Sequence, residues 1–241
     1  MGKEKGKMII LGISILSIAL ILVGVLLWKG VLSGDSDSSG TQPGTTAPTV
    51  ISFPYSIPGT DLVIQAINSY DGVFVEDGSN RQVTGISAMV LVNNGQKDIS
   101  YADIVLLQGK TELHYKATCI PAGATLVVQE WNAAAYVDTA YVLSSADVSA
   151  GTEFGMAEAL IKVEEVENGT LLITNLTEET ISGIHLYYKF AYEMGEIYVG
   201  GITYSVKITD LLPGKSQKVT ANHFATGFSE VVMISTYETA D

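Results

Sequence analysis

Apolar and polar residues alternate in short runs from about Asp61 to the C-terminus. The runs are rich in Val, Ile, Thr and Tyr and are separated by Gly, Asn and Asp. This pattern is typical of β-strands that bury one face. No amphipathic run with a useful helical period follows residue 50 in the sequence. We therefore predict an all-β fold for this part of the chain.

The segment "GIHLYYKFAY" shows the alternation most clearly and predicts a strand with a core-facing and a solvent-facing set of side chains. The core-facing set is Ile184, Leu186, Tyr188, Phe190 and Tyr192, and the solvent-facing set is His185, Tyr187, Lys189 and Ala191. A hairpin is predicted just upstream, because Asn168–Gly169 supplies the two positive-φ residues of a type I′ turn.

Two segments of the chain repeat one pattern: "NNGQKDISYADIVLL" (93–107) and "NLTEETISGIHLYY" (175–188). At an offset of 82 residues Asn93 falls on Asn175, and the core-facing positions coincide. Further on, an offset of 92 places Pro121 on Pro213, because the second copy has a longer hairpin, "YEMGEIYVGGITY". These matches predict two copies of one β-domain, each of a size that folds alone. Short strands with turns every ~8–12 residues favour a β-sandwich for each copy.

An apolar segment of 21 residues, "MIILGISILSIALILVGVLLW" (8–28), lies between Lys7 and Lys29. A helix of about 20 apolar residues is long enough to cross a membrane. Lysines dominate the side before the segment, which predicts a cytoplasmic N-terminus and an exported remainder. Cleavage as a signal peptide after Ser33 is the alternative, but the apolar run exceeds the ~7–15 residues of an ordinary signal core.

The segment "GVLSGDSDSSGTQPGTTAPT" (30–49) has the composition of a flexible spacer. The sequence thus predicts two tandem immunoglobulin-like β-sandwich domains preceded by one N-terminal transmembrane helix. The expected divisions are a cytoplasmic tail (1–7), the transmembrane helix (8–28), a linker (29–55), a first sandwich (56–148) and a second sandwich (149–241).

The charge is uneven along the chain, whose net charge is −13. Four of the 13 basic residues and one of the 26 acidic residues lie in residues 1–29, so the remainder carries −16. Such acidity argues against nucleic-acid binding, because phosphate backbones repel it. The single cysteine, Cys119, cannot form an internal disulfide, which suits a bacterial surface better than a eukaryotic secretory protein. We expect Cys119 to be a small core residue.

The second copy has a recognisable order of features between residues 168 and 222: a strand that ends in Asn, a polar turn, a long aromatic strand, a Gly-containing hairpin and "LLPGKSQKVT". In this order it resembles the bacterial FxLYD-type immunoglobulin-like module. "YYKFAYEMG" stands where that family has Phe-x-Leu-Tyr-Asp, and the first copy keeps only the Asn turn and the "IPAG" turn. The resemblance implies an exported β-sandwich in a Gram-positive-type bacterium, and that family has no common catalytic residues.

The residues that could carry chemistry are few. The histidines, His114, His185 and His223, lack metal-ligand spacing, and no hydrolase elbow or phosphate-binding loop occurs in the sequence. We predict no enzymatic activity, no cofactor and no metal, and leave open a calcium site near Asp71 and Asp77, where Asp-Gly turn chemistry is the simpler explanation.

Tyrosines are the main functional lead, because the longer hairpin of the second copy concentrates them. We expect Tyr187, Tyr198 and Tyr204 to form a partner-binding edge for a protein or a glycan, with cross-strand pairing as the structural alternative. Trp131 is expected in the core.

These observations predict a single-pass cell-membrane protein of a bacterial surface that displays two binding or scaffolding domains outside the cell. One alternative is an accessory subunit of a membrane or envelope complex, since the apolar segment contains small residues that suit helix packing: Gly12, Ser14, Ser17, Ala19 and Gly24. The other is an envelope enzyme of unknown type.

Overall fold

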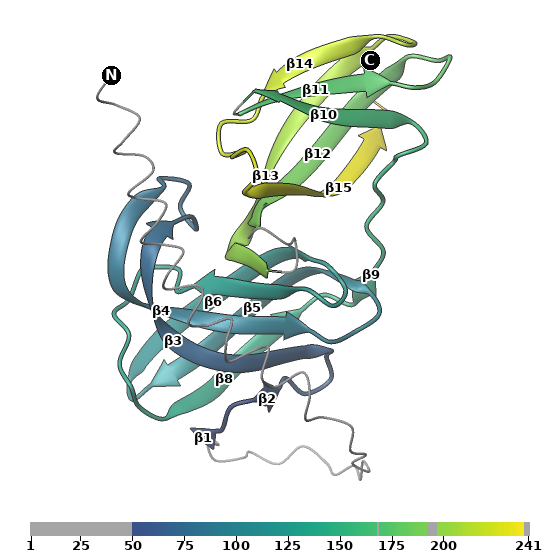
Figure 1. Cartoon of the computed structure of the whole chain (residues 1–241). Helices are drawn as coiled ribbons and strands as arrows, with labels where there is room; N and C mark the ends of the chain where they lie inside the picture. The colour runs from purple at the N-terminus through teal and green to yellow at the C-terminus, as the bar shows by residue number, and fades with distance from the viewer. Residues whose placement is uncertain (1–49, 168, 192–196, 239–241) are drawn as a thin grey trace, which may run out of the picture.

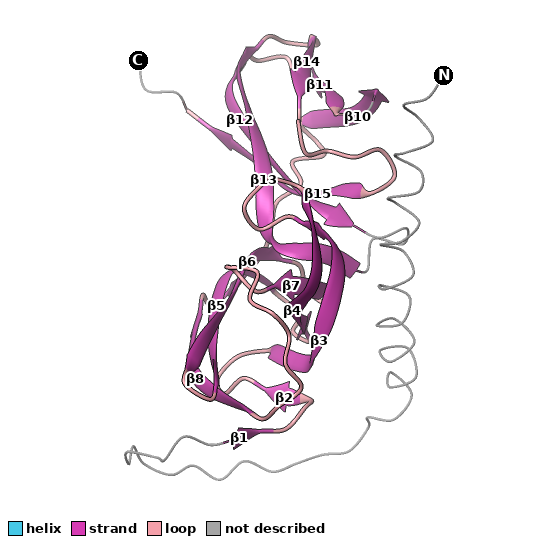
Figure 2. Cartoon of the chain, turned by 90° about the vertical axis from the view of Figure 1, so that its left-hand side faces the viewer, coloured by secondary structure: helices cyan, strands magenta, loops and turns pink. Residues whose placement is uncertain are grey.

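The computed structural model describes residues 50–167, 169–191 and 197–238. All regular structure in these ranges is β-strand (Figure 2), so the predicted all-β class is confirmed. Within these ranges no helix is both long and apolar enough to cross a membrane. The tail, the membrane helix and the linker up to residue 49 lie outside the described residues and stay predictions.

Strands β1 to β9 form the part of the chain that we call the N-terminal half (50–152), and strands β10 to β15 form the C-terminal half (161–237). The N-terminal strands are β1 (Val50–Ile51), β2 (Tyr55–Ser56), β3 (Leu62–Phe74), β4 (Arg81–Asn93), β5 (Asp98–Gln108), β6 (Thr111–Ile120), β7 (Thr125–Gln129), β8 (Tyr141–Val148) and β9 (Gly151–Thr152). The C-terminal strands are β10 (Ile161–Glu167), β11 (Thr170–Asn175), β12 (Ile181–Ala191), β13 (Ile197–Leu211), β14 (Ser216–Thr220) and β15 (Ser229–Tyr237).

The strands form three sheets (Figure 1). Sheet A has the order β1-β8-β5-β6, with β9 added on β5, and sheet C has the order β10-β11-β14. Sheet B has seven strands in the order β15-β12-β13-β7-β4-β3-β2 and therefore runs through both halves. The join is a parallel pairing of β13 with β7, in which Ile197 lies opposite Thr125.

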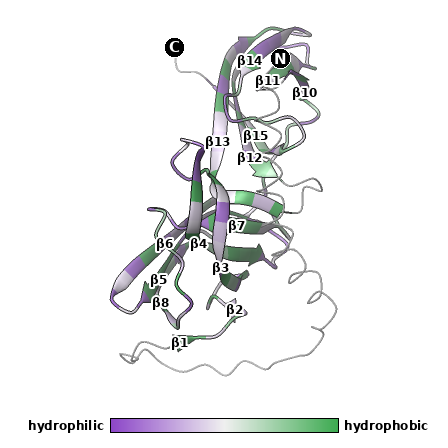
Figure 3. Cartoon of the chain, turned by 60° about the vertical axis from the view of Figure 1, so that its left-hand side comes forward, coloured by the Kyte–Doolittle hydropathy of each residue, from purple (hydrophilic) through white to green (hydrophobic). Residues whose placement is uncertain are grey.

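Each half is sandwich-like, because a hydrophobic core separates two layers of strands. In the N-terminal half, residues of sheet A such as Ile104 and Leu106 pack with residues of sheet B such as Met89 and Leu126. In the C-terminal half, sheet C and the other end of sheet B enclose a second core. Figure 3 shows apolar and polar segments following one another along the strand ribbons, as one-sided burial requires.

The two halves have the same strand order. If β3 to β8 are matched in sequence with β10 to β15, the paths β3-β4-β7 and β6-β5-β8 become β10-β11-β14 and β13-β12-β15. The buried residues Asn93 and Asn175 end matched strands, and each donates from Nδ2 to the carbonyl four residues later, at 2.9 and 2.7 Å. The internal repeat seen in the sequence is thus a repeat of structure.

The second part of the sequence alignment was wrong by one residue. Cys119 and Asp210 both have positive φ, 45° and 54°, as do Gly123 and Gly214, at 75° and 60°. These matches fix an offset of 91, which places Pro121 on Leu212 rather than on Pro213. The prolines misled the alignment because backbone conformation, and not the proline itself, is what the two turns share.

The β3–β4 hairpin curls back over its own sheet (Figure 1). Its register shifts between Ile64 and Ala66 and between Tyr70 and Gly72, and such bulges bend a hairpin. A third apolar cluster lies under the curl and includes Tyr70, Phe74 and Val127. The bend carries the hairpin tip, residues 75–80, towards the C-terminal half.

Regular structure begins inside the range that the sequence predicted as linker, because Val50–Ile51 pairs with β8 and Tyr55–Ser56 pairs with β3. At the other end, Gly151–Thr152 pairs with β5, beyond the expected start of the second domain at residue 149. These three short strands satisfy backbone groups at the margins of the N-terminal half.

Candidate functional site

The junction between the halves forms where β13 passes close to the N-terminal half. Gly200 has φ +86°, and a Cβ there would overlap the Val75 side chain. A Cβ on Gly201 would overlap the carbonyl oxygen of Lys116 in β6. The two glycines therefore allow an approach that residues with side chains would block.

Glu76 stands at the tip of the curled hairpin, and its carboxylate lies in this junction. Oε1 accepts hydrogen bonds from the backbone N–H of Gln129 at 2.9 Å and of Gly201 at 2.8 Å. Oε2 accepts one from the N–H of Ile202 at 3.1 Å. The residue is only 4% exposed, so backbone groups of β7 and β13 take the place of water around the carboxylate.

Lys189 approaches the same segment of β13 from β12. Its Nζ donates to the carbonyl of Gly201 at 2.6 Å and to that of Ile202 at 2.9 Å, and the residue is 0% exposed. The prediction that Lys189 faces solvent was wrong. The β12–β13 register shifts between Tyr188 and Phe190, and the end of β12 leaves its own half and enters the junction, where both of its faces are covered.

Burial dominates the protonation of both groups. It raises the pKa of Glu76 to about 7, against the opposing effects of the three N–H groups and Lys189. It lowers the pKa of Lys189 to about 8, against the opposing charge of Glu76. Each shift has the sign expected when the charged form loses its hydration.

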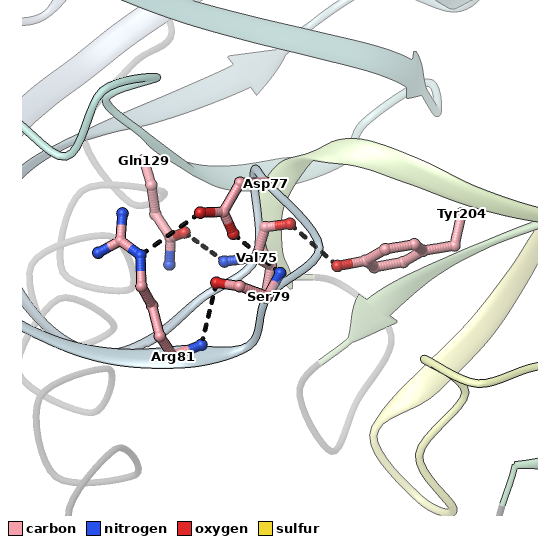
Figure 4. Close-up of polar contacts among 6 residues, drawn as sticks. All are labelled: Val75, Asp77, Ser79, Arg81, Gln129 and Tyr204. Atoms are coloured by element: carbon pink, nitrogen blue, oxygen red, sulfur yellow. Dashed lines mark hydrogen bonds and ion pairs between the residues drawn. The ribbon is translucent and has the colours of Figure 1, made fainter.

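Further polar contacts fix the hairpin tip from two sides (Figure 4). Gln129 accepts the N–H of Val75 at 2.9 Å with Oε1 and donates to the Val73 carbonyl at 2.7 Å with Nε2. Tyr204 of β13 donates its hydroxyl to the Val75 carbonyl at 2.9 Å. The backbone of the tip is thus bound to β7 and to β13 at once.

The outer side of the tip is ordered by its own side chains and by a ring stack. Asp77 accepts the N–H of Ser79 at 2.8 Å and contacts Arg81 at 3.4 Å (Figure 4). His223 stacks on Tyr204 with ring centroids 4.2 Å apart, and its Nδ1 lies 3.2 Å from Nδ2 of Asn80. Through Asn80, His223 and Tyr204, polar and aromatic contacts thus also join the hairpin tip to the C-terminal half beside the buried Glu76.

The structure places the three predicted tyrosines at or near the junction instead of on an open edge. Tyr198 is 4% exposed and belongs to the N-terminal core, so the expectation that it is exposed was wrong. Tyr204 donates to the hairpin tip, as described above. Tyr187 is half-buried against the N-terminal core, with its hydroxyl 2.6 Å from Nδ1 of His185. In the described part of the longer hairpin, residues 197–204, both tyrosines thus contact the N-terminal half.

Other predicted positions have mixed outcomes. Cys119 is buried, as expected. Trp131 is 38% exposed, not in the core, and the Nζ of Lys116 lies 4.9 Å from its ring centroid. The contact of this cation with the ring face stabilises the partly exposed tryptophan.

The acidic groups counted as calcium ligands have other partners. Asp71 accepts the N–H of Gly85 at 2.6 Å, Asp77 binds within its own turn, and Glu76 points into the junction. In the part of the chain that the structure describes, no three His, Cys, Asp or Glu side chains gather as a metal site would require.

Sequence reasoning considered Glu76 only as a calcium ligand and Lys189 only as a solvent-facing residue, and it missed their place in the junction, although one feature singled each of them out. Lys189 is the one charged residue in the otherwise aromatic and aliphatic run "LYYKFAY", and Glu76 directly follows the apolar "GVFV" at a hairpin tip. Gly200–Gly201 inside a strand is the third sign, since paired glycines in a strand mark a close approach of another backbone.

The arrangement suits mechanical coupling. Both charged groups are buried and direct their hydrogen bonds to backbone groups. The bonds of Glu76 tie β13 to the N-terminal half, and those of Lys189 hold the same segment of β13 to β12. The molecule is, in class, a sandwich-like all-β protein whose halves share one sheet. Comparison with protein-family models, with curated proteins and with solved structures finds no match to this chain.

Proposed function

We propose that this chain is a non-enzymatic binding or scaffolding protein of a bacterial cell envelope, in which two immunoglobulin-like domains are held outside the membrane by an N-terminal anchor at residues 8–28. The observation that carries the proposal is the junction. It joins the two halves through a shared sheet and through the buried carboxylate of Glu76, which accepts backbone N–H groups of both halves, so surfaces on both halves keep one relative orientation.

A fixed orientation is useful to a protein that presents surfaces to a partner, because less conformational entropy is lost on binding. The resemblance of residues 168–222 to the FxLYD-type module supports the domain class. The charge distribution supports the location, since basic residues gather before the apolar segment and acidic residues after it.

Cysteine labelling in intact cells tests the location. Cys119 is buried and serves as a silent background. Ser144, which is exposed on β8, is changed in the variant Ser144→Cys, and a second variant carries Gly2→Cys in the predicted tail. A membrane-impermeant maleimide should label the first in intact cells and the second only after permeabilisation. The reverse pattern contradicts the proposed topology.

Crosslinking in intact cells then tests the binding role. A photoreactive amino acid at exposed positions of the two halves should capture an envelope protein. If capture occurs only from positions within residues 8–28, the chain is an accessory subunit that binds through its membrane helix, and the display role fails.

A further inference from the structure

The N-terminal half is closed on one side by the segment 50–56, which we call the strap. Its first strand, β1, pairs with β8 of sheet A, and its second, β2, pairs with β3 of sheet B. The strap therefore crosses from one layer to the other. Ile51 is 6% exposed, and Phe53 and Tyr55 pack on the core, so alternate strap side chains fill the open side of the sandwich.

The C-terminal half has no equivalent of the strap among its described residues. β10 and β15 correspond to β3 and β8, yet β10 pairs only with β11 and β15 only with β12. The chain that precedes β10 is diverted, because β9 pairs with β5 of the N-terminal half. In the described residues, two backbone bonds join this chain to the C-terminal half beyond β10: from the N–H of Ile234 to the carbonyl of Gly155 and from the N–H of Leu176 to the carbonyl of Leu160, both at 2.8 Å.

A groove lies at the side thus left open. It has a volume of about 490 Å³, within the size range of ligand-binding clefts. Its floor reaches the C-terminal core at Ile161, Leu171, Phe224 and Ile234, and the exposed Leu176 stands at its margin. Edge strands with free backbone groups are templates for a further strand.

Three of the groove residues are the structural equivalents of residues that the strap pairs with. In the N-terminal half the strap lies opposite Ile64, Val63, Val142 and Tyr141. Because Leu62 and Ile161 pair with the matched asparagines, Ile64 corresponds to Val163 and Val63 to Lys162. Val142 lies opposite Leu107 in the N-terminal half, and Glu230 lies opposite Lys189 in the C-terminal half. Leu107 and Lys189 are matched at the offset of 82 residues, so Val142 corresponds to Glu230.

These three equivalents line the groove, whereas Ser229, which corresponds to Tyr141, is not among the residues that line it. The first half of the molecule thus shows what kind of segment fits this side of the second: short strands, here joined by a bend at Phe53–Pro54, with apolar side chains at alternate positions.

Charge indicates the kind of chain that would fill the groove. Three carboxylates line it, those of Glu158, Glu165 and Glu230, against one ammonium group, that of Lys162. A second copy of this protein is disfavoured, because each copy carries −13 and its own strap is already used in its own core.

We propose that the groove between β10 and β15 binds an extended segment of a partner protein, with apolar side chains at alternate positions and basic side chains between them, which adds a strand to the edge of β10. This proposal deepens the proposed binding role, on which it rests, by naming the surface and the chemistry of the partner.

Peptides derived from the strap test the proposal with the full chain in mild detergent. The probe is a synthetic peptide of residues 49–58 with Ser52→Lys and Ser56→Lys, since both serines are exposed in the strap. The first control peptide carries Glu at the same two positions, and the second has the composition of the probe in scrambled order. Calorimetry measures each affinity at low and at moderate salt.

Electrostatic complementarity predicts that the lysine peptide binds at least about tenfold more tightly than the glutamate peptide, and that salt narrows the difference. The scrambled peptide should not bind. Equal affinity of all three peptides, or no binding of the lysine peptide at millimolar concentration, overturns the proposal.

A charge-reversed protein gives an independent check. The double variant Glu158→Lys, Glu165→Lys should prefer the glutamate peptide, since both residues are exposed and their substitution leaves the core intact. The matched control, Glu112→Lys with Asp138→Lys, reverses the same charge at exposed positions of the N-terminal half and should bind as the unmodified chain does. A control that loses binding equally contradicts the site.

The outcome separates this proposal from the wider one. Envelope crosslinks that map away from β10 and β15, together with absent peptide binding, overturn the groove and leave the display role standing. Sedimentation that shows self-association abolished by the charge-reversed variant makes a second copy the occupant and also overturns it.

Discussion

Glu76 and Lys189 bind opposite ends of the same peptide unit, that between Gly201 and Ile202. The carboxylate accepts its N–H at 3.1 Å, and the ammonium group donates to its carbonyl at 2.6 Å. The acid belongs to the N-terminal half and the base to the C-terminal half. The pair therefore holds the passage of β13 through the junction by polarising a peptide from both ends.

Removing either member should be costly, and removing both should cost less than the sum. Glu76→Ala leaves three N–H groups without their acceptor and a buried ammonium without its counter-charge, which predicts a loss of about 3–5 kcal/mol in the free energy of unfolding. For Lys189→Met we expect a similar loss, and for the double variant a coupling of about 1–3 kcal/mol. Urea unfolding of the four proteins measures the cycle.

The matched control is Lys162→Met. Lys162 pairs with Glu164 at 2.8 Å, but both are largely exposed, so the loss should stay below about 1 kcal/mol. Strictly additive losses at Glu76 and Lys189 would show that the two residues act independently.

The raised pKa of Glu76 predicts that stability falls as pH rises through the acid range. Between the ordinary value of 4.5 and about 7, the unfolded chain has released this proton while the folded chain retains it. Deprotonation then favours the unfolded state, by at most about 1.4 kcal/mol per pH unit. The stabilisation by protonated Glu76 is fully present below pH 4.5 and has been lost by about pH 7, above which it no longer changes with pH.

Glu76→Gln isolates this effect, because the amide does not titrate. The unfolding free energy of the unmodified chain minus that of the variant should decrease from pH 4.5 to 7 and then level off. A difference that rises with pH over this window would mean that the N–H groups and Lys189 outweigh burial.

The sequence predicted the fold class and much of the repeat, because alternation reports burial against a strand's own partner layer. Ile184, Leu186 and Tyr188 are buried as expected, at 0–2% exposure. The prediction failed at the next residue, where β12 enters the junction. Its outer face is covered there by the other half of the molecule, and a single sequence contains no sign of which distant segment covers a strand.

The candidate site depended on the same missing information. The extra tyrosines of the second copy were visible, but whether they face solvent or another domain depends on a parallel pairing of three residues, 197–199 with 125–127. The groove was equally hidden, because its role is recognised only by comparison with the strap, and strap residues 50–55 fell within the expected linker.

Close packing at Gly201 predicts a sharp cost for one added methyl group. Gly201→Ala would drive a Cβ into the Lys116 carbonyl oxygen, and the backbone has little room to yield between β6 and β12. We expect a loss of about 3 kcal/mol, measured by thermal unfolding, together with a broader distance distribution between spin labels on the two halves.

Gly155→Ala is the matched control, since the nearest atom to its Cβ, the Ile234 carbonyl oxygen, lies at an ordinary 3.7 Å. It should unfold within about 0.5 kcal/mol of the unmodified chain. A tolerated Gly201→Ala would mean that β6 and β13 are not in close contact in solution.

The repeated asparagines give the test of internal equivalence. Asn93 and Asn175 are both 0% exposed. Each uses its side chain to bind the turn that follows its strand and the end of a strand further along, β6 for Asn93 and β13 for Asn175. Replacing either by Ala leaves buried carbonyl groups without a donor, which predicts a loss of about 2–4 kcal/mol for each variant.

Asn94→Ala is the control, because Asn94 is exposed and bonds through its backbone N–H to the Asp61 carbonyl at 2.9 Å. Its effect should lie within about 0.5 kcal/mol. Chemical unfolding compares the three variants. If the two turns are equivalent, the losses at Asn93 and Asn175 should be similar, because each side-chain amide donates to carbonyl groups at equivalent positions in its own half. A large loss at one and none at the other would contradict the equivalence on which the match of strap and groove depends.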